Sequence, residues 1–316
     1  MKKLIIVAVA AISVAFIRVT GREEPASEAE LGKLLFSDPI LSKDYTVSCA
    51  SCHIPAYAFS DTSATSKGVG GIKGDRNTPS AMNVVLHGFF FWDGRAQTLE
   101  EQALAPIENP KEMNLPVDQA VRRLINSPTY SAYFKKLYNE EPTPCNLAKA
   151  IAAFERTLET SDSPFDIWKF YDKPDAVSES ARRGFEVFNT KGKCIECHFG
   201  SNLARNQFRN VGLFDGKKLN DSGRSVISGD LLDIGKFKVS PLRNVAITAP
   251  YMHNGMFKTL SEVIEFYNDP EKIVPGNISR DSVLAKPLGL TEIEKADLEA
   301  FLHSLTDKRF SGIVKK

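Results

Sequence analysis

Six residues form two copies of the motif Cys-x-x-Cys-His: Cys49, Cys52 and His53, then Cys194, Cys197 and His198. At this spacing two thiols can add to the vinyl groups of one haem, and the adjacent histidine can reach its iron. The same residue types could instead form a redox-active thiol pair or a zinc site. With only five cysteines and five histidines in the chain, two chance copies are improbable. The motifs therefore predict two covalent haem c groups, with His53 and His198 as proximal iron ligands.

The first residues are typical of an export signal. Lys2 and Lys3 precede an uncharged stretch over residues 4–17, and charged residues follow it. This stretch is shorter than the roughly 20 apolar residues that a membrane-spanning helix needs. We expect a signal peptide over residues 1–21 and a periplasmic mature protein, which agrees with the attachment of haem c outside the cytoplasm. The alternative is an uncleaved membrane anchor.

Composition narrows the class of protein. A chain of 316 residues with 42% hydrophobic and 25% charged residues is typical of a globular protein of about two domains, and excludes a disordered, collagen-like or multi-span membrane protein. Lys plus Arg number 40 against 39 Asp plus Glu. This balance gives no general attraction to nucleic acid, so we expect no nucleic-acid partner.

The second part of the chain echoes the first. An Arg-Asn pair follows each haem motif, at residues 76–77 and 243–244, and Trp-Asp-Gly at 92–94 is matched by His-Asn-Gly at 253–255. We call the separation between residues 92 and 253 the repeat offset. We interpret this echo as an internal duplication that gives two homologous haem domains.

The elements around the motifs are predicted to be helices. Thr98 and Thr259 each precede a glutamate by three positions, which is a capping box at the start of a helix. Residues 148–158 carry apolar side chains at helical spacing. Residues 61–78 and 200–239 are rich in Gly, Ser, Asn and Asp, which predicts long loops around the haems.

We therefore predict a mainly α fold, with two homologous cytochrome c-like haem domains and long loops. The N-terminal haem domain is expected over residues 22–165 and the C-terminal one over residues 166–316. Pro164 and Pro174 mark the linker region between them.

The duplication also predicts that the two haems differ. Tyr267 follows the second capping box, and the repeat offset places Pro106 at the matching position in the first domain. Tyrosine can ligate iron and proline cannot. If this position faces iron in both domains, the second haem has six ligands and the first has an open position. Met252 and Met256 are rival ligands, and Tyr267 could also be an amphipathic core residue.

Several longer motifs resemble the bacterial di-haem cytochrome c peroxidase family, which includes a methylamine-utilisation relative that matures a tryptophan cofactor. The resemblance covers residues 31–310. It rests on both haem motifs and on four further segments: 76–79 (RNTP), 91–95 (FWDGR), 106–113 (PIENPKEM) and 248–255 (TAPYMHNG).

The resemblance implies roles for three residues near the first haem, the family's peroxide site. Glu112 matches the catalytic acid and base, Gln102 a neighbouring amide, and Trp92 a tryptophan between the haems. From its position alone, Glu112 is equally well a carboxylate at a helix start, and Trp92 a core residue. A carboxyl at that site could take a proton from one peroxide oxygen and return it to the other.

The resemblance also implies two metal sites and one departure. Asn77, with the backbone oxygens of Thr248 and Pro250, matches an inter-haem calcium site. Tyr267 matches the distal ligand of the second haem, where peroxidases have methionine and the tryptophan-cofactor relative has tyrosine. Many family peroxidases have a distal histidine before the Arg-Asn run, but residues 66–75 contain none. His87 is the nearest candidate, so we expect an open first haem at rest.

The main interpretation is a cytochrome c peroxidase that reduces hydrogen peroxide to water. A small cytochrome c or cupredoxin would supply electrons through the second haem, and a homodimer is compatible with the resemblance. Two alternatives stay open. Tyr267 and the missing histidine favour an oxidase of protein side chains, whereas Gln102 favours the peroxidase. A non-enzymatic electron carrier would need six ligands at both haems, which Pro106 argues against.

Overall fold

The computed structural model describes residues 24–313. The predicted signal peptide lies outside these residues. Within them, no helix has both the length and the apolar character that crossing a membrane requires.

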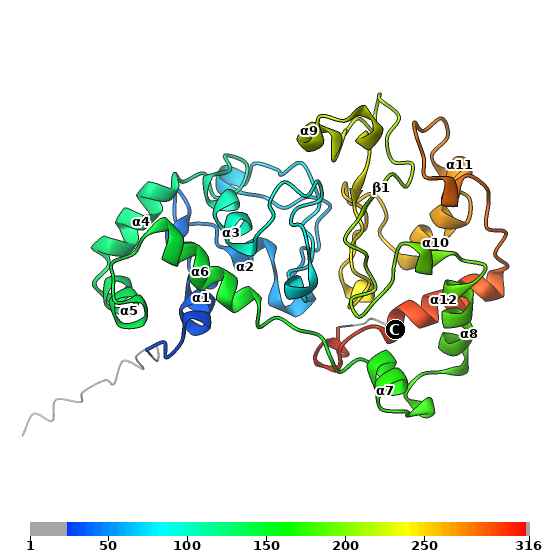
Figure 1. The fold of residues 1–316 in the computed structure, drawn as a ribbon, viewed down its shortest axis with the longest axis horizontal. Helices are drawn as coiled ribbons and strands as arrows, with labels where there is room; N and C mark the ends of the chain where they lie inside the picture. The colour runs from blue at the N-terminus through cyan, green and yellow to red at the C-terminus, as the bar shows by residue number, and fades with distance from the viewer. Residues whose placement is uncertain (1–23, 314–316) are drawn as a thin grey trace, which may run out of the picture.

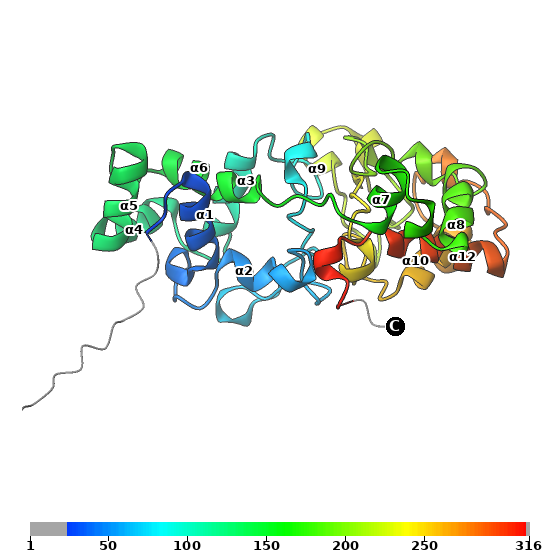
Figure 2. The ribbon, with the colours of Figure 1, turned by 90° about the horizontal axis from the view of Figure 1, so that it is seen from below.

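The fold is mainly α, as predicted, and two groups of helices lie side by side (Figure 1). We call residues 24–160 the first half and residues 161–313 the second half. The first half contains α1 (Glu28–Ser37), α2 (Cys49–Cys52), α3 (Leu99–Glu108), α4 (Val117–Asn126), α5 (Pro128–Tyr138) and α6 (Pro144–Glu155). The second half contains α7 (Pro164–Phe170), α8 (Glu179–Asn189), β1 (Phe208–Arg209), α9 (Ser225–Ser228), β2 (Phe237–Lys238), α10 (Leu260–Asn268), α11 (Pro270–Ile273) and α12 (Glu292–Ser304). The view turned by 90° keeps the two groups apart (Figure 2).

The predicted capping boxes are present. The side chain of Thr98 accepts a hydrogen bond from the Glu101 amide at the start of α3, and Thr259 does the same with Glu262 at the start of α10. The predicted loops are largely irregular, although the second contains the two short antiparallel strands β1 and β2. The capping boxes therefore fix where α3 and α10 begin.

Each half is built on one tight helix crossing. In the first half α1 crosses α6, and a side chain at Gly32 would clash with the Ala150 carbonyl. In the second half α8 crosses α12, and a side chain at Gly184 would clash with the Asp297 carbonyl. Only glycine allows backbones to approach this closely. The crossings make α6 and α12 equivalent, with Ala150 in the place of Asp297.

Aromatic packing beside the crossings confirms this register. Phe36 meets Phe154 with ring centroids 5.1 Å apart at 64°. Phe188 meets Phe301 with centroids 5.1 Å apart at 62°. Both are edge-to-face pairs in the cores of their halves.

The loops that follow the haem motifs also repeat, and they keep the repeat offset. Asn83 and Asn244 both have left-handed backbones, with φ of 57° and 62°, and each begins a short 3-10 turn. The bridge between Phe90 and Ala96 recurs between residues 251 and 257. The predicted match between the Arg-Asn pairs at 76–77 and 243–244 is therefore wrong, because the backbone equates Asn244 with Asn83.

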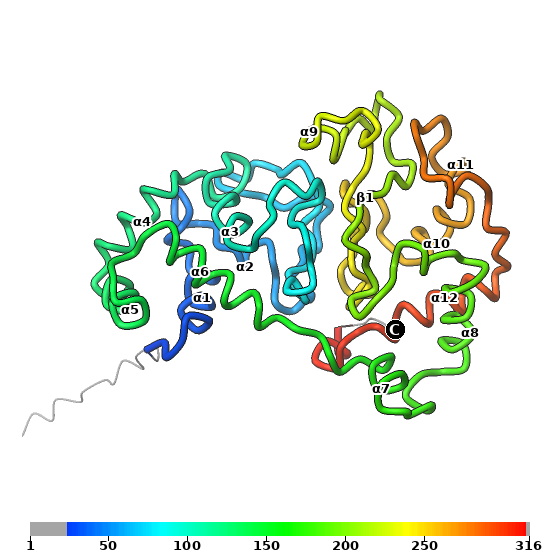
Figure 3. The backbone as a smooth tube through the Cα atoms, in the orientation of Figure 1, coloured from blue at the N-terminus to red at the C-terminus, as the bar shows by residue number. Residues whose placement is uncertain are grey.

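The halves are joined by the segment between α6 and α7, which Figure 3 shows as the green tube crossing between the two groups. The chain after α12 returns to this segment. The amide of Lys308 donates to the Asp162 carbonyl at 3.0 Å, and the Ser161 amide donates to the Asp307 carboxylate at 3.4 Å. The C-terminal segment thus braces the linker.

Candidate functional site

A cavity of about 940 Å³ brings every predicted site residue together. Its lining includes both haem motifs and the residues that the family resemblance singled out: Asn77, Trp92, Gln102, Glu112, Thr248, Pro250 and Tyr267. These residues come from both halves, so the cavity runs along the contact between them.

The first haem motif forms the short helix α2. The Ser48 amide donates to the Ser51 hydroxyl at 3.0 Å, which caps the start of this helix. His53 directly follows it, and its Nδ1 lies 3.0 Å from the Phe59 carbonyl oxygen. Because a carbonyl can only accept, Nδ1 carries the proton and Nε2 keeps its lone pair for a metal. Burial lowers the pKa of His53, which also favours the neutral ligand form.

The second motif has the same arrangement. Nδ1 of His198 lies 3.0 Å from the Leu203 carbonyl oxygen, and burial lowers its pKa to about 4. The motif cysteines of both halves are free thiols. Two unpaired thiols beside one neutral, oriented imidazole are the donor set that covalent haem needs, so the residues present fit haem c in each half.

Two polar side chains that were predicted near the first haem line the cavity. Helix α3 supplies Gln102, and a turn after this helix supplies Glu112. The side-chain amide of Asn109 donates to Glu112 Oε1 at 2.7 Å. Burial raises the pKa of Glu112, while Asn109 and Arg95 oppose the shift. Glu112 does not begin a helix, since α4 starts only at Val117, and it holds a proton more readily than an exposed glutamate does.

Tyr267 lies in the second half at the position that Pro106 occupies in the first half. It lies on α10, faces the cavity, and burial raises its pKa, with Cys197 and Cys194 as further causes. Of the rival ligands, Met252 also lines the cavity. Met256 is 37% exposed, and its sulfur contacts the Asn254 amide at 3.6 Å. The structure thus favours Tyr267 or Met252 over Met256.

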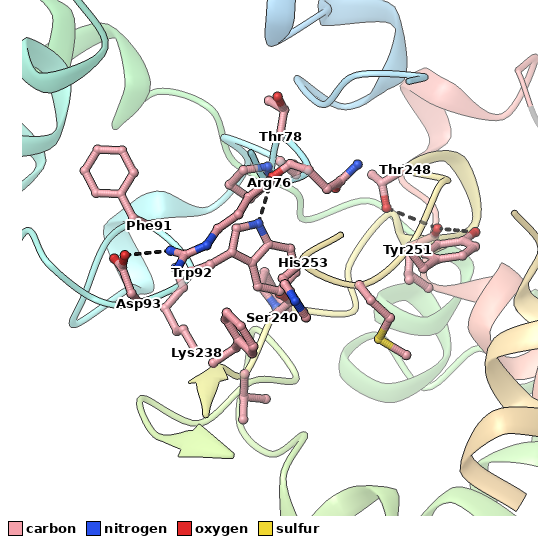
Figure 4. A pocket seen from close by; sticks show the side chains of 18 of the residues that line it. Arg76, Thr78, Phe91, Trp92, Asp93, Lys238, Ser240, Thr248, Tyr251 and His253 are labelled. Atoms are coloured by element: carbon pink, nitrogen blue, oxygen red, sulfur yellow. Dashed lines mark hydrogen bonds and ion pairs between the residues drawn. The ribbon is translucent and has the colours of Figure 1, made fainter. Parts of the chain in front are cut away.

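Trp92 lies between the two halves (Figure 4). Its Nε1 donates to the Asn77 carbonyl at 2.8 Å. Its ring centroid lies 6.4 Å from that of His253, which stacks on Phe237 at 3.7 Å. The rings of Trp92 and His253 thus form an aromatic contact between the two halves.

The predicted calcium ligands lie in the same contact region. The side-chain amide nitrogen of Asn77 donates to the Ser63 and Ala64 carbonyls at 3.3 Å each, and no donor in the described part of the chain bonds to its Oδ1. Between residues 24 and 313, no amide donates to the carbonyl oxygen of Thr248 or Pro250. Residues 24–313 also contain no cluster of three or more His, Cys, Asp or Glu suited to a metal. A cation here would therefore depend on neutral oxygens, which calcium accepts.

Two buried ionisable residues were not among the predicted site residues. Glu155 ends α6 and is 7% exposed; its Oε2 has no hydrogen-bond partner, and burial raises its pKa to about 8. Lys238, on β2, is 9% exposed, and burial lowers its pKa to about 8. Its Nζ donates to the Phe89 carbonyl at 3.1 Å and lies 3.4 Å from His87 Nδ1. His87 thus contacts Lys238. No pattern in the sequence indicated that Glu155 or Lys238 is buried.

Comparisons with known proteins identify the family of this chain. The sequence model of the di-haem cytochrome c peroxidase family matches residues 26–173. The methylamine utilization protein MauG of Methylorubrum extorquens is 37% identical over 281 residues, which cover 87% of this chain and 77% of that protein. The cytochrome c551 peroxidase of Pseudomonas aeruginosa is 38% identical over 299 residues, which cover 91% of this chain and 82% of that protein.

Solved structures give the same result. A MauG-like protein associated with microbial copper homeostasis superposes with a TM-score of 0.82 at 33% identity, covering 91% of this chain and 94% of that chain. The di-haem peroxidase BthA of Burkholderia thailandensis superposes with a TM-score of 0.81 at 25% identity, covering 92% and 88%. On its motifs, its fold and these relatives, the chain belongs to the di-haem cytochrome c peroxidase family and is an oxidoreductase that carries haem c.

Proposed function

We propose that this enzyme reduces hydrogen peroxide to water in the first half and receives electrons through the second half. The observation that carries the proposal is the difference between the two sides of the cavity. In the first half, the cavity is lined by Glu112, whose pKa burial raises, and by Gln102. In the second half, it is lined by Tyr267, a side chain that can close an iron coordination site.

The reaction consumes two electrons and two protons: H2O2 + 2 e⁻ + 2 H⁺ → 2 H2O. When bound, the two haems supply the electron storage and the iron that this chemistry needs. Glu112 accepts a proton from one peroxide oxygen and returns it to the departing one, and its raised pKa favours the first of these transfers. Gln102 donates a hydrogen bond that orients the peroxide.

Trp92 connects the two sites in this proposal. Its indole is oxidisable, and it contacts both halves through Asn77 and His253. Electrons from a small cytochrome c or cupredoxin would enter at the second haem and cross at Trp92. Calcium bound by Asn77 Oδ1 and the carbonyls of Thr248 and Pro250 would hold this contact in place.

The cellular location and the domain boundaries in this proposal follow from the sequence. The N-terminal segment supports export to the periplasm, where haem c is attached, and the two haem domains would comprise residues 22–165 and 166–316. Oxidation of a protein side chain is a second candidate function. Tyr267 in the cavity and the absence of histidine from residues 66–75 favour it.

The resting spectrum tests the proposal. We expect the fully oxidised protein to contain one high-spin and one low-spin haem, and to consume peroxide without prior reduction. Steady-state oxidation of a reduced c-type cytochrome by peroxide separates the peroxidase from the side-chain oxidase. Two low-spin haems, or no peroxide-dependent oxidation of any small donor, would reject the peroxidase.

A further inference from the structure

The contact between the halves follows an approximate two-fold symmetry. The amide of Asn77 donates to the His253 carbonyl at 2.7 Å, and the amide of Lys238 donates to the Trp92 carbonyl at 2.7 Å. Asn77 and Lys238 are separated by the repeat offset, as Trp92 and His253 are. The two bonds are therefore the same contact made once in each direction, as in a symmetric dimer interface.

This symmetry assigns a counterpart to each predicted calcium ligand. At the repeat offset, Asn77 corresponds to Lys238, Thr248 to His87, and Pro250 to Phe89. The counterparts are themselves in contact: Lys238 Nζ donates to the Phe89 carbonyl at 3.1 Å and lies 3.4 Å from His87 Nδ1. A positive group thus lies at the position that mirrors the predicted metal site.

Lys238 differs from five other cations of the cavity. Arg76, Arg95, Lys111 and Arg209 each pair with an aspartate, and Arg243 pairs with Asp166. Among the residues that the structure describes, no carboxylate forms an ion pair with Lys238, although it is only 9% exposed. A buried unpaired charge is costly unless local dipoles stabilise it. Here the Phe89 carbonyl provides such a dipole.

We propose that the Lys238 ammonium provides a permanent positive charge at the contact between the halves. It occupies the position that mirrors the calcium site at Asn77. The ammonium at the end of a lysine stem reaches roughly as far from its Cα as a calcium ion bound at about 2.4 Å to an asparagine oxygen. A positive charge in each half therefore binds a carbonyl of the other half. In the second half this charge is the ammonium of a side chain, and in the first half it is an exchangeable metal ion. The exchangeable part rests on the calcium site proposed above.

Rebuilding the symmetric site tests this directly. The double substitution Lys238→Asn with His87→Thr gives the counterpart the same residue types as Asn77 and Thr248. Bound calcium is measured in the holoprotein by atomic emission after chelation, reloading with calcium and desalting. We expect one calcium ion in the wild type and two in the double variant. Equal stoichiometry in both proteins would overturn the proposal.

Thermal unfolding of the holoprotein provides a second measurement. Lys238→Met removes the ammonium and should lower the midpoint by several degrees, with no recovery on adding calcium, whereas the double variant should recover with calcium. Lys236→Met is the matched control, because Lys236 pairs with Asp233 in its own loop. A Lys238→Met midpoint equal to that of the control would overturn the proposal. A wild type without calcium would refute the metal at Asn77, and the comparison of the two methionine variants would still decide the role of the ammonium.

Discussion

The two halves place the same backbone around two different sets of side chains. Helix α3 carries Pro106 where α10 carries Tyr267. The crossing helices also differ. Because Ala150 is equivalent to Asp297, Glu155 of α6 is equivalent to Leu302 of α12. Both of these side chains line the cavity. At these two positions the first half therefore has a proline and a carboxyl group, and the second half has a phenol and an apolar side chain.

This difference separates the role of the fold from the role of the site. The helix crossing, the capped helix and the oriented histidine recur in both halves and fit haem in each. Proton transfer and iron ligation depend instead on a few side chains that the common backbone leaves free to vary. Exchanging those side chains between the halves is therefore the most direct way to test the assignment.

The largest effect is expected at Glu112. Glu112→Gln keeps the shape of the side chain but removes its ability to take and return a proton, so peroxide turnover should fall by about 10²–10⁴-fold. Both haems should remain attached, which the intact mass will show. Glu108→Gln is the matched control, because Glu108 is the last residue of α3, is exposed and does not line the cavity. Wild-type turnover in Glu112→Gln would remove Glu112 from the mechanism.

Tyr267→Met should make the second half resemble an ordinary electron-transfer haem. A phenolate oxygen stabilises ferric iron more than a thioether does, so the midpoint potential of the low-spin haem should rise by on the order of 0.1 V, within the ~0.8 V range that axial ligands span. Spectroelectrochemical titration measures this shift. An unchanged potential and spectrum would show that Tyr267 is a packing residue, and Met252 would then be the ligand to test.

Calcium removal should weaken the contact that both halves share. Trp92 is held by the Asn77 carbonyl, so loss of a cation at Asn77 should displace the indole and lower turnover by roughly tenfold, since misplacement by about 1 Å can cost up to ~10²-fold. The measurement is steady-state activity before and after chelation, with calcium re-addition as the control. Full activity in protein shown to be free of calcium would contradict a functional site.

Glu155 gives the smallest and most local test. Glu155→Leu installs the residue of the second half, and removing a buried carboxyl without a full set of partners should raise the free energy of unfolding by about 1–3 kcal/mol. The folded carboxyl keeps its proton up to about pH 8, whereas the unfolded one loses it near pH ~4.3. Wild-type stability should therefore fall as pH rises through this window.

The gain from Glu155→Leu should accordingly be larger at pH 8 than at pH 5, as thermal unfolding at the two pH values will show. The reverse substitution, Leu302→Glu, should destabilise the second half, and its cost should likewise grow as the pH rises. If Glu155→Leu lowers stability at both pH values, the carboxyl has a partner in the haem-loaded protein.

The sequence predicted the parts of this molecule that depend on local chemistry. The haem motifs, the capping boxes at Thr98 and Thr259 and the mainly α fold follow from short-range patterns. The Arg-Asn alignment failed because it matched letters instead of backbone register, which the left-handed Asn83 and Asn244 reveal. Glu155 and Lys238 were missed because their burial is produced by distant segments; the Lys238 ammonium meets the carbonyl of Phe89, which belongs to the other half.

The reciprocal bonds between Asn77 and His253 and between Lys238 and Trp92 have a consequence for dilute solutions. A symmetric interface between separate subunits dissociates as the protein concentration falls. Here the segment between α6 and α7 ties the two surfaces together, so each meets the other at an effective concentration set by the linker. The alignment of Trp92 with His253 is consequently independent of how much of the protein a cell makes.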